Sequence, residues 1–234
     1  AWQLTAKCLR PLPDKRHGLA GPEARVRQRY LDLVTSAEAR DVLRARSAAI
    51  QSLRETLIDR GYLEVETPVL QRVQAGDAAR PFTTRAGAYD LRLYLRVGPG
   101  RYLKRLAVGG VERVFELGRC FRNEGADVKH NPEFTLLSAY QAYADHRTMR
   151  MLAQTLVQRA ALAAYGSTVA YRPGTNGTPI EYDLTGDWPA VPFYHALSAA
   201  LGEFVSADTG VSALRRMAEA AGVPCDERVE RGAL

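Results

Sequence analysis

The residues with the clearest chemical potential surround a polar loop between two apolar segments, residues 111–121 and 133–143. The loop and the start of the second segment carry Arg122, Glu124, Lys129, His130 and Phe134. Arginine and histidine can contact phosphates, a carboxylate can accept from an exocyclic amine, and a phenylalanine ring can lie against a purine. Both segments read as strands, so the pattern predicts a nucleotide-gripping hairpin. An ordinary charged hairpin is the alternative, because charged loops are common.

The elements that must position this hairpin are predicted from periodicity and capping residues. Helices are expected over residues 22–34, from a capping box at Thr35 and Glu38 to Gly61, over residues 101–108, from Asp145 to Gly166, and from Asp208 or Thr209 to Gly222. Further strands are expected over residues 2–10, 62–66, 91–97, 168–172 and 179–184. Helices interspersed with sequential, turn-linked strands indicate an α+β fold with an antiparallel sheet.

Composition sets the class of the molecule. The 234 residues are 46% hydrophobic and 25% charged, which is ordinary for a globular protein. Cys8, Cys120 and Cys225 are an odd number without a close pair, and the four histidines are scattered, so neither disulfides nor a metal site is expected. No signal peptide or long apolar run is seen, and the expected location is the cytoplasm.

Positive charge is concentrated in the first part of the chain. Residues 1–60 hold 12 Lys/Arg against 7 Asp/Glu, whereas residues 171–234 hold 5 against 9. A basic front half is compatible with a polyanionic partner such as tRNA. A solvated arginine-rich surface explains it equally well, so charge alone does not decide between the two.

Several motifs together carry a family resemblance. The run Phe121-Arg-Asn-Glu124, followed by His130-Asn-Pro-Glu-Phe-Thr135, resembles the second signature motif of class II aminoacyl-tRNA synthetases in its lysyl form. Further matching stretches, in the family's order, are residues 29–33, 61–68, 79–82 and 102–106. The similarity runs from about residue 2 to residue 234.

The resemblance implies a fold and an assembly. It implies a class II antiparallel sheet flanked by helices, incomplete at the C-terminus. Residues 1–13 would be a remnant of an OB-fold anticodon-binding domain, and residues 14–234 a partial catalytic domain. In the family the helix and strand that correspond to residues 36–66 form a homodimer interface. An amphipathic helix that packs on its own domain is the alternative.

The resemblance also implies roles for the hairpin residues. Amino-acid activation is attack of a carboxylate on the α-phosphate of ATP, and catalysis depends on positioning and charge neutralisation. Arg122 would clamp the α-phosphate and the carboxylate. Glu124 and the backbone near Asn131 would read adenine, Phe134 would stack on it, and His130 would approach the outer phosphates.

The amino-acid pocket departs from the family pattern. A site for lysine needs carboxylates to compensate the ammonium, because an unpaired buried charge is costly. Two family acids are replaced here, by Gly100 and Ser138, while Tyr140 remains. Gly76 is retained in an altered glycine-rich loop. The residues expected to bind ATP are retained, whereas two acids expected to bind the substrate lysine are replaced. This pattern indicates altered amino-acid specificity or lost activation.

Three functions stay open at this point. The first is ATP-dependent activation of lysine and its transfer to tRNA. The second is a synthetase paralogue with another acceptor, in lysyl-lipid synthesis or protein-lysine modification, and the third is a non-catalytic nucleotide-binding or dimerising paralogue. The family's third motif and its magnesium ligands are expected beyond Leu234, so the 234 residues alone are not expected to complete adenylation.

Overall fold

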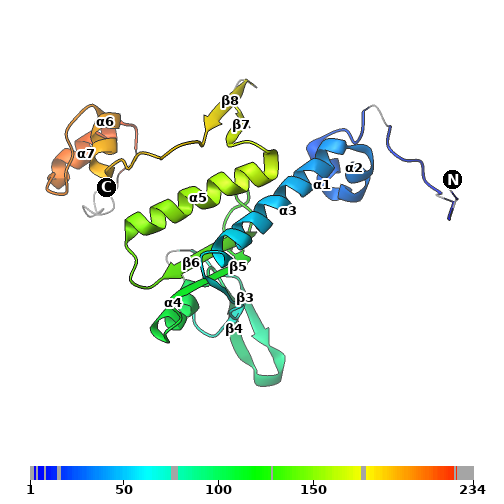
Figure 1. The fold of residues 1–234 in the computed structure, drawn as a ribbon, viewed down its shortest axis with the longest axis horizontal. Helices are drawn as coiled ribbons and strands as arrows, with labels where there is room; N and C mark the ends of the chain where they lie inside the picture. The colour runs from blue at the N-terminus through cyan, green and yellow to red at the C-terminus, as the bar shows by residue number, and fades with distance from the viewer. Residues whose placement is uncertain are drawn as a thin grey trace. The chain divides into compact units, whose positions relative to one another are not determined.

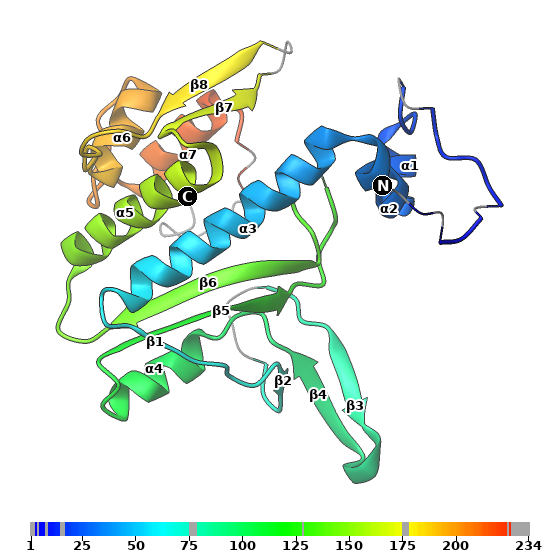
Figure 2. The same ribbon diagram turned by 45° about the vertical axis from the view of Figure 1, so that its right-hand side comes forward.

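The structure is a computed structural model, shown in Figures 1 and 2. It describes residues 3, 5–7, 9–14, 17–74, 79–127, 129–174, 178–223 and 225. These belong to two compact units, Ala1–Thr185 and Gly186–Leu234. The predicted division at residue 13 is a different boundary and stays a prediction.

The antiparallel hairpin predicted from the polar loop is the centre of the first unit. Strands β5 (Arg113–Phe121) and β6 (Glu133–Gln141) pair along their full length, from Arg113 opposite Gln141 to Phe121 opposite Glu133. The short strand β1 (Leu63–Glu64) adds to the other side of β5 in parallel, so the sheet order is β1-β5-β6. The predicted antiparallel sheet is confirmed, and the parallel edge strand is an addition to it.

Two long helices, α3 (Ala37–Ile58) and α5 (His146–Tyr165), lie side by side across one face of this hairpin (Figures 1 and 2). The core between helices and sheet is built from Leu57, Tyr62, Phe115, Leu152 and Leu156. The odd-numbered side chains of β5 point toward this face of the hairpin, because strand side chains alternate between the two faces of a sheet. Within the described residues, neither these helices nor any other is long and apolar enough to cross a membrane.

The opposite face of the hairpin carries α4 (Gly100–Val108) and a second sheet. That sheet has the order β2-β4-β3, from strands β2 (Leu70–Gln71), β3 (Thr83–Ala86) and β4 (Leu91–Leu95), with the 3-10 turn η1 (Gly87–Tyr89) between β3 and β4. On β6 the alternation that buries Leu137 and Ala139 toward the helices turns the even-numbered side chains toward α4. Those side chains are Phe134, Leu136, Ser138 and Tyr140.

Capping residues set the ends of α5 as predicted, but the predicted cap of α3 needs a correction. Asp145 caps α5 by accepting the Thr148 backbone N–H at 2.9 Å, and Gly166 ends it in the left-handed conformation, both as predicted. The predicted capping box at Thr35 is wrong. Ser36 is the N-cap of α3 and accepts from the Ala39 backbone N–H at 3.1 Å, because the Thr35 hydroxyl donates to the Leu31 carbonyl within the preceding helix.

The N-terminal segments differ from prediction as well. The single helix expected over residues 22–34 is two, α1 (Pro22–Arg27) and α2 (Arg29–Thr35), separated at Gln28. Of the strand expected over residues 2–10, residues 2, 4 and 8 lie outside the described residues, and the described remainder has no strand.

The chain after α5 continues into a hairpin and then the second unit. Strands β7 (Val169–Pro173) and β8 (Pro179–Asp183) pair antiparallel, as the sequence predicts. The second unit holds α6 (Phe193–Leu201), which was not predicted, and α7 (Val211–Ala220). Gly210 stands at the N-cap of α7, and no side chain caps it, so the predicted cap at Asp208 or Thr209 is wrong.

A buried ion pair joins the two sheets of the first unit. Arg96, which follows β4, pairs with Glu116 of β5, and the two side chains are only 3% and 4% exposed. The Arg96 guanidinium also donates to the Arg119 carbonyl at 2.8 Å, and the Thr67 hydroxyl donates to Glu116 at 2.6 Å. Because the two charges are paired and both Glu116 oxygens accept hydrogen bonds, the network offsets the cost of desolvating the two charges.

We predict that Glu116→Gln lowers the free energy of unfolding by about 3–5 kcal/mol, because the substitution leaves the buried Arg96 guanidinium uncompensated. The matched control is Glu133→Gln on the same hairpin. Glu133 pairs with Arg119 at 3.6 Å with both side chains more than half exposed, so its loss should cost less than about 1 kcal/mol. Urea unfolding of both variants checks this, and equal losses would contradict it.

Candidate functional site

All five residues predicted to bind ATP line one cavity at the loop end of the β5–β6 hairpin, which we call the hairpin cavity. Its volume is about 190 Å³. Its lining consists of Arg122, Glu124, Gly125, Lys129, His130, Asn131 and Phe134. The hairpin brings them together because its strands end at Phe121 and Glu133, so that the loop folds back over the start of β6. Three of these side chains carry a positive charge or can gain one, which suits an anionic ligand.

Arg122 and Phe134 are arranged as a pair. The Arg122 backbone N–H donates to the Pro132 carbonyl at 2.8 Å, which closes the hairpin beyond its last paired residues. The Arg122 guanidinium lies over the Phe134 ring, with its central carbon 5.2 Å from the ring centroid. A guanidinium held on an aromatic face keeps its N–H donors available at the edge for a phosphate or carboxylate.

The loop is organised by Asp127, which the sequence analysis did not single out. Its carboxylate accepts the backbone N–H groups of Lys129 at 2.6 Å and His130 at 2.8 Å. The His130 ring Nδ1 lies 2.8 Å from the same carboxylate. Hydrogen bonding from His130 in the first place, and from the Lys129 backbone next, holds the pKa of Asp127 below its ordinary value. The Asp-x-x-His spacing is the signal that could have identified it.

A second segment closes one side of this loop. The Asn123 backbone N–H donates to the Arg80 carbonyl at 2.7 Å, and the Arg80 backbone N–H donates to the Glu124 carboxylate at 3.3 Å. Glu124, predicted to read an exocyclic amine, thus also anchors the chain that enters β3. Gly76, predicted in the amino-acid pocket, lies outside the described residues.

The other predicted pocket residues line a second cavity of about 320 Å³ next to the first, which we call the adjoining cavity. Its lining consists of Val97, Gly98, Pro99, Gly100, Arg101, Lys104, Arg122, Leu136, Ser138 and Tyr140. Arg122 belongs to both linings, so one guanidinium stands between the two cavities. Lys104 is the member that sequence reasoning missed, and its position one helical turn after Gly100 was the available signal.

Gly100 and Tyr140 are in close contact. A Cβ atom at position 100 would lie 2.8 Å from the Tyr140 hydroxyl, so the tyrosine occupies the space that a side chain there would need. Lys104 approaches the same ring, with its Nζ 5.9 Å from the centroid. The place of one predicted family acid is therefore filled by a phenol and bordered by an ammonium group.

No carboxylate belongs to the described lining of the adjoining cavity. The nearest acid in the pairing register is Glu116, which stands directly opposite Ser138. Glu116 is already engaged by Arg96 on one oxygen and by the Thr67 hydroxyl on the other. It therefore cannot compensate a ligand's positive charge without giving up the pair that joins the two sheets.

Metal ligation and thiol chemistry are two further possibilities to compare with the described residues. In the described part of the chain, no group of three or more His, Cys, Asp or Glu side chains is placed to hold a metal ion. Burial raises the pKa of the Cys120 thiol, opposite Phe134, so the thiol stays protonated and is a poor nucleophile.

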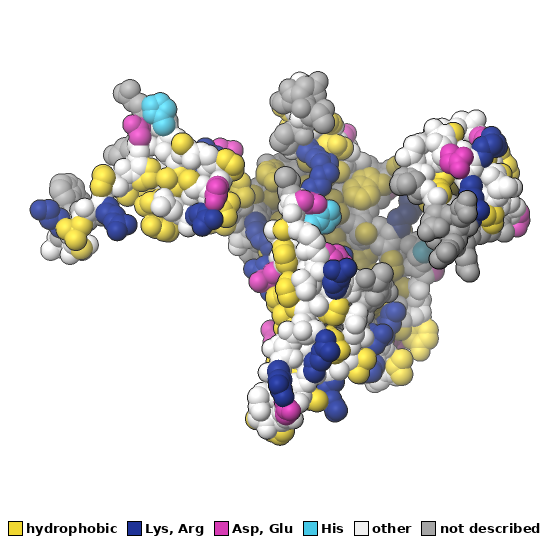
Figure 3. Space-filling view, turned by 180° about the vertical axis from the view of Figure 1, so that it is seen from behind, with side chains coloured by type: hydrophobic (Ala, Val, Ile, Leu, Met, Phe, Trp, Pro, Cys, Tyr) yellow, Lys and Arg dark blue, Asp and Glu magenta, His cyan; other side chains and the backbone are white. Residues whose placement is uncertain are grey.

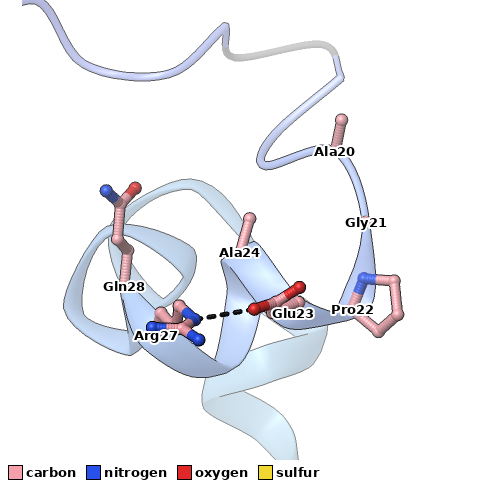
Figure 4. Close-up of a pocket in the computed structure, with 7 residues that line it drawn as sticks. All are labelled: Ala20, Gly21, Pro22, Glu23, Ala24, Arg27 and Gln28. Atoms are coloured by element: carbon pink, nitrogen blue, oxygen red, sulfur yellow. Dashed lines mark hydrogen bonds and ion pairs between the residues drawn. The ribbon is translucent and has the colours of Figure 1, made fainter.

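A depression near the start of α1 carries none of the predicted residues (Figure 4). It is lined by one continuous segment, residues 20–24 with Arg27 and Gln28. Its two charged side chains, Glu23 and Arg27, bind each other at 2.8 Å. Because these charges neutralise each other and no other element contributes, this depression is not a candidate site.

The charge distribution remains compatible with a polyanion. On the face in Figure 3, dark-blue Lys and Arg side chains outnumber the acidic ones over the arm that β3 and β4 form. That hairpin carries Arg85 and Arg92 against one acid, Asp90, which pairs with Arg85. Arg92 forms no ion pair with a described residue, and an exposed arginine of this kind favours contact with phosphates without specifying them.

The chain is similar to one family of proteins and to several individual relatives. The family described as "tRNA synthetases class II (D, K and N)" matches residues 21–227. The lysylphosphatidylglycerol biosynthesis bifunctional protein LysX of Nocardia farcinica is 55% identical over 99% of the chain. Proteins of the same name are 54% identical in Mycobacterium sp. (strain KMS) and 51% in Rhodococcus opacus, over the whole chain. The chain spans about a fifth of each relative, 20% of the first and 21% of the other two.

We predict that the Asp127 carboxyl titrates below its ordinary value of about 3.9 and that His130→Ala moves the pKa upward, part of the way back, because the Lys129 backbone donor remains. A carboxyl whose pKa is lowered by folding contributes stability above its unfolded pKa, and this is lost as the pH falls through the folded value. Carboxyl-detected NMR titration checks this, with Asp145, which caps α5, as the control. An unmoved Asp127 pKa in His130→Ala would contradict the arrangement.

Proposed function

Because the chain belongs to the family of class II tRNA synthetases (D, K and N), we propose that it binds ATP in the hairpin cavity and serves the ATP-dependent activation of an amino acid. The observation that carries the proposal is the position of Arg122 in the linings of both cavities. One guanidinium can then contact an α-phosphate on one side and a carboxylate on the other.

The chemistry of activation requires such a group. A carboxylate oxygen forms a bond to the α-phosphorus of ATP, and the bond from that phosphorus to the bridging oxygen breaks, with the electron pair leaving on pyrophosphate. The two reactants are both anionic, so they repel each other until a cation between them neutralises the charge. Arg122 would supply this charge, and its contact with Phe134 would fix its orientation before the ligands arrive.

The remaining hairpin residues would hold the nucleotide. Phe134 would stack on the adenine. Glu124 and the backbone near Asn131 would accept hydrogen bonds from the edge of the adenine and donate hydrogen bonds to it. His130 and Lys129 would approach the outer phosphates. The Asp127 contacts would keep the His130 ring turned toward the cavity. Magnesium would accompany the nucleotide, as is general in this family.

For the acceptor, we propose the lipid pathway named in the relatives and not protein synthesis. Support comes from identities of 51–55% to LysX proteins over essentially the whole chain. Lysylphosphatidylglycerol synthesis needs an activated amino acid, which a synthetase-type domain would provide. In this proposal, transfer RNA carries the activated amino acid. The chain would also form a homodimer through α3 and β1.

A second candidate is a nucleotide-binding paralogue without activation. The specific observation in its favour is the absence of a free carboxylate from the described lining of the adjoining cavity. In this case ATP binding would persist and pyrophosphate exchange would not occur with any amino acid.

We predict that the 234-residue chain binds ATP weakly and that Arg122→Ala abolishes the binding, because the cavity loses its central cation. The control is Arg119→Ala, which removes an exposed arginine of β5 that lies outside the cavity lining. Isothermal titration calorimetry measures both. Unchanged ATP affinity in Arg122→Ala would overturn the assignment of the hairpin cavity.

We further predict amino-acid-dependent ATP–pyrophosphate exchange by the full gene product, tested with all twenty amino acids. Transfer of the radiolabelled amino acid to tRNA, and from tRNA to phosphatidylglycerol, then tests the acceptor. Exchange with intact ATP binding supports activation, whereas silence with intact ATP binding would establish the non-catalytic candidate. Accumulation of aminoacyl-tRNA with no lipid product would contradict the lipid pathway.

A further inference from the structure

A third cavity of the first unit is lined by none of the predicted site residues. Its volume is about 330 Å³, near the lower end of the range for small-molecule sites, roughly 300–1,000 Å³. Its described lining comes from residues 68–73, around β2, and from α4. We call it the arginine cavity because this lining includes Arg72, Arg101 and Arg105.

The three arginines bring positive charge to the cavity from two elements. Arg101 and Arg105 lie one turn apart on α4, where like charges repel each other. Arg72 directly follows β2 and adds a third charge from a different part of the chain. None of the three forms an ion pair with a described residue. An anion bound between them would offset this repulsion.

Neighbouring groups restrict two of the guanidiniums. The Arg105 guanidinium lies over the Tyr102 ring, with its central carbon 5.5 Å from the ring centroid, and Tyr102 also lines the cavity. An Arg101 Nη approaches the Gln74 carbonyl at 3.5 Å. The wall beneath is fixed by Gln71, which is only 3% exposed and whose amide donates to the Pro68 carbonyl at 3.4 Å. Since a guanidinium has five N–H donors, most donors remain for a ligand.

The chemistry of the lining favours phosphate among the common anions. The planar donor fork of arginine matches the oxygen pairs of phosphate and carboxylate groups. A phosphomonoester carries a charge of about −1.5 to −2 at pH 7 and three acceptor oxygens. A carboxylate or a phosphodiester carries only one negative charge. Three arginines at one small cavity therefore suit the doubly charged group best.

We propose that the arginine cavity binds a phosphate dianion, either inorganic phosphate or the phosphate of a small phosphomonoester. Arg72, Arg101 and Arg105 donate hydrogen bonds to its terminal oxygens. The arginine cavity shares no described lining residue with the hairpin cavity, so this site is independent of the proposed nucleotide site. Arg101 also belongs to the lining of the adjoining cavity, so a bound phosphate would lower the positive charge there.

The test is a titration of the 234-residue chain with inorganic phosphate and, separately, with glycerol 3-phosphate, followed by the NMR signals of the arginine Nε–H groups. The signals of Arg72, Arg101 and Arg105 should shift with one saturating dissociation constant. Arg92, an exposed arginine that lies over Tyr94 outside this lining, should shift at least about tenfold less. Equal affinity for both ligands would support recognition of the phosphate group alone, and tighter binding of the ester would support a phosphomonoester. Similar shifts at Arg92 would show general ionic screening and would overturn the proposal.

Variants of exposed arginines separate this cavity from the rest of the surface. Arg72→Gln and Arg105→Gln should each weaken phosphate binding about tenfold, whereas Arg92→Gln should leave it within about twofold. ATP affinity, measured by calorimetry, should stay unchanged in all three variants, because none of these residues lines the hairpin cavity. Equal weakening by Arg92→Gln would contradict the assignment. Phosphate binding that is lost in Arg122→Ala and retained in Arg72→Gln would place the anion in the hairpin cavity and would also contradict it.

Two further measurements address other occupants of the cavity. Asp77, the acid nearest to Arg72 in the sequence, lies outside the described residues. Asp77→Asn should leave phosphate affinity within about twofold, and an increase of about tenfold would show that the chain's own carboxylate fills the cavity, against the proposal. The second measurement uses an RNA oligonucleotide without a terminal phosphate. If this RNA shifts the three arginine signals and neither small phosphate does, the cavity contacts a nucleic-acid backbone and the proposal is wrong.

Discussion

The buried pair of Arg96 and Glu116 is the interaction on which the rest of the first unit depends. It ties the chain after β4 to the middle of β5, and Thr67 and the Arg119 carbonyl complete its hydrogen bonds. Such a pair stabilises only when every charge and donor is satisfied. It also explains Gly118, because a Cβ atom there would lie 2.5 Å from the Arg96 guanidinium. The second sheet is thereby held against the hairpin face that carries both cavities.

The same pair shapes the electrostatics of the site. Glu116 stands opposite Ser138 of β6, which lines the adjoining cavity, but the Glu116 charge is compensated by its ion pair with Arg96. The basic residues around that cavity therefore act without an internal counter-ion in the described lining. The hairpin cavity and the adjoining cavity share Arg122 in their linings, so one guanidinium contributes charge to both.

Local signals predicted much of the fold. The alternating apolar segments around residues 122–132 predicted the hairpin, and Asp145 with Gly166 predicted both ends of α5, because a cap is satisfied within one helical turn. Prediction failed where neighbouring elements compete for a residue. Thr35 was available as a cap by sequence, but its hydroxyl is used by α2, so Ser36 takes the role. The sequence patterns did not predict the boundary between the two units after Thr185.

The sequence by itself determined the residue types of the site, their order and the family to which the chain belongs, since these are properties of motifs. Tertiary structure alone decided that Arg122 is shared between two cavities, that Lys104 from α4 faces Tyr140 from β6, and that Glu116 is unavailable to a ligand. Charge compensation depends on distances between side chains far apart in the chain. For this reason the loss of two acids could be read from the sequence, while the net positive character of the cavity appeared only in the fold.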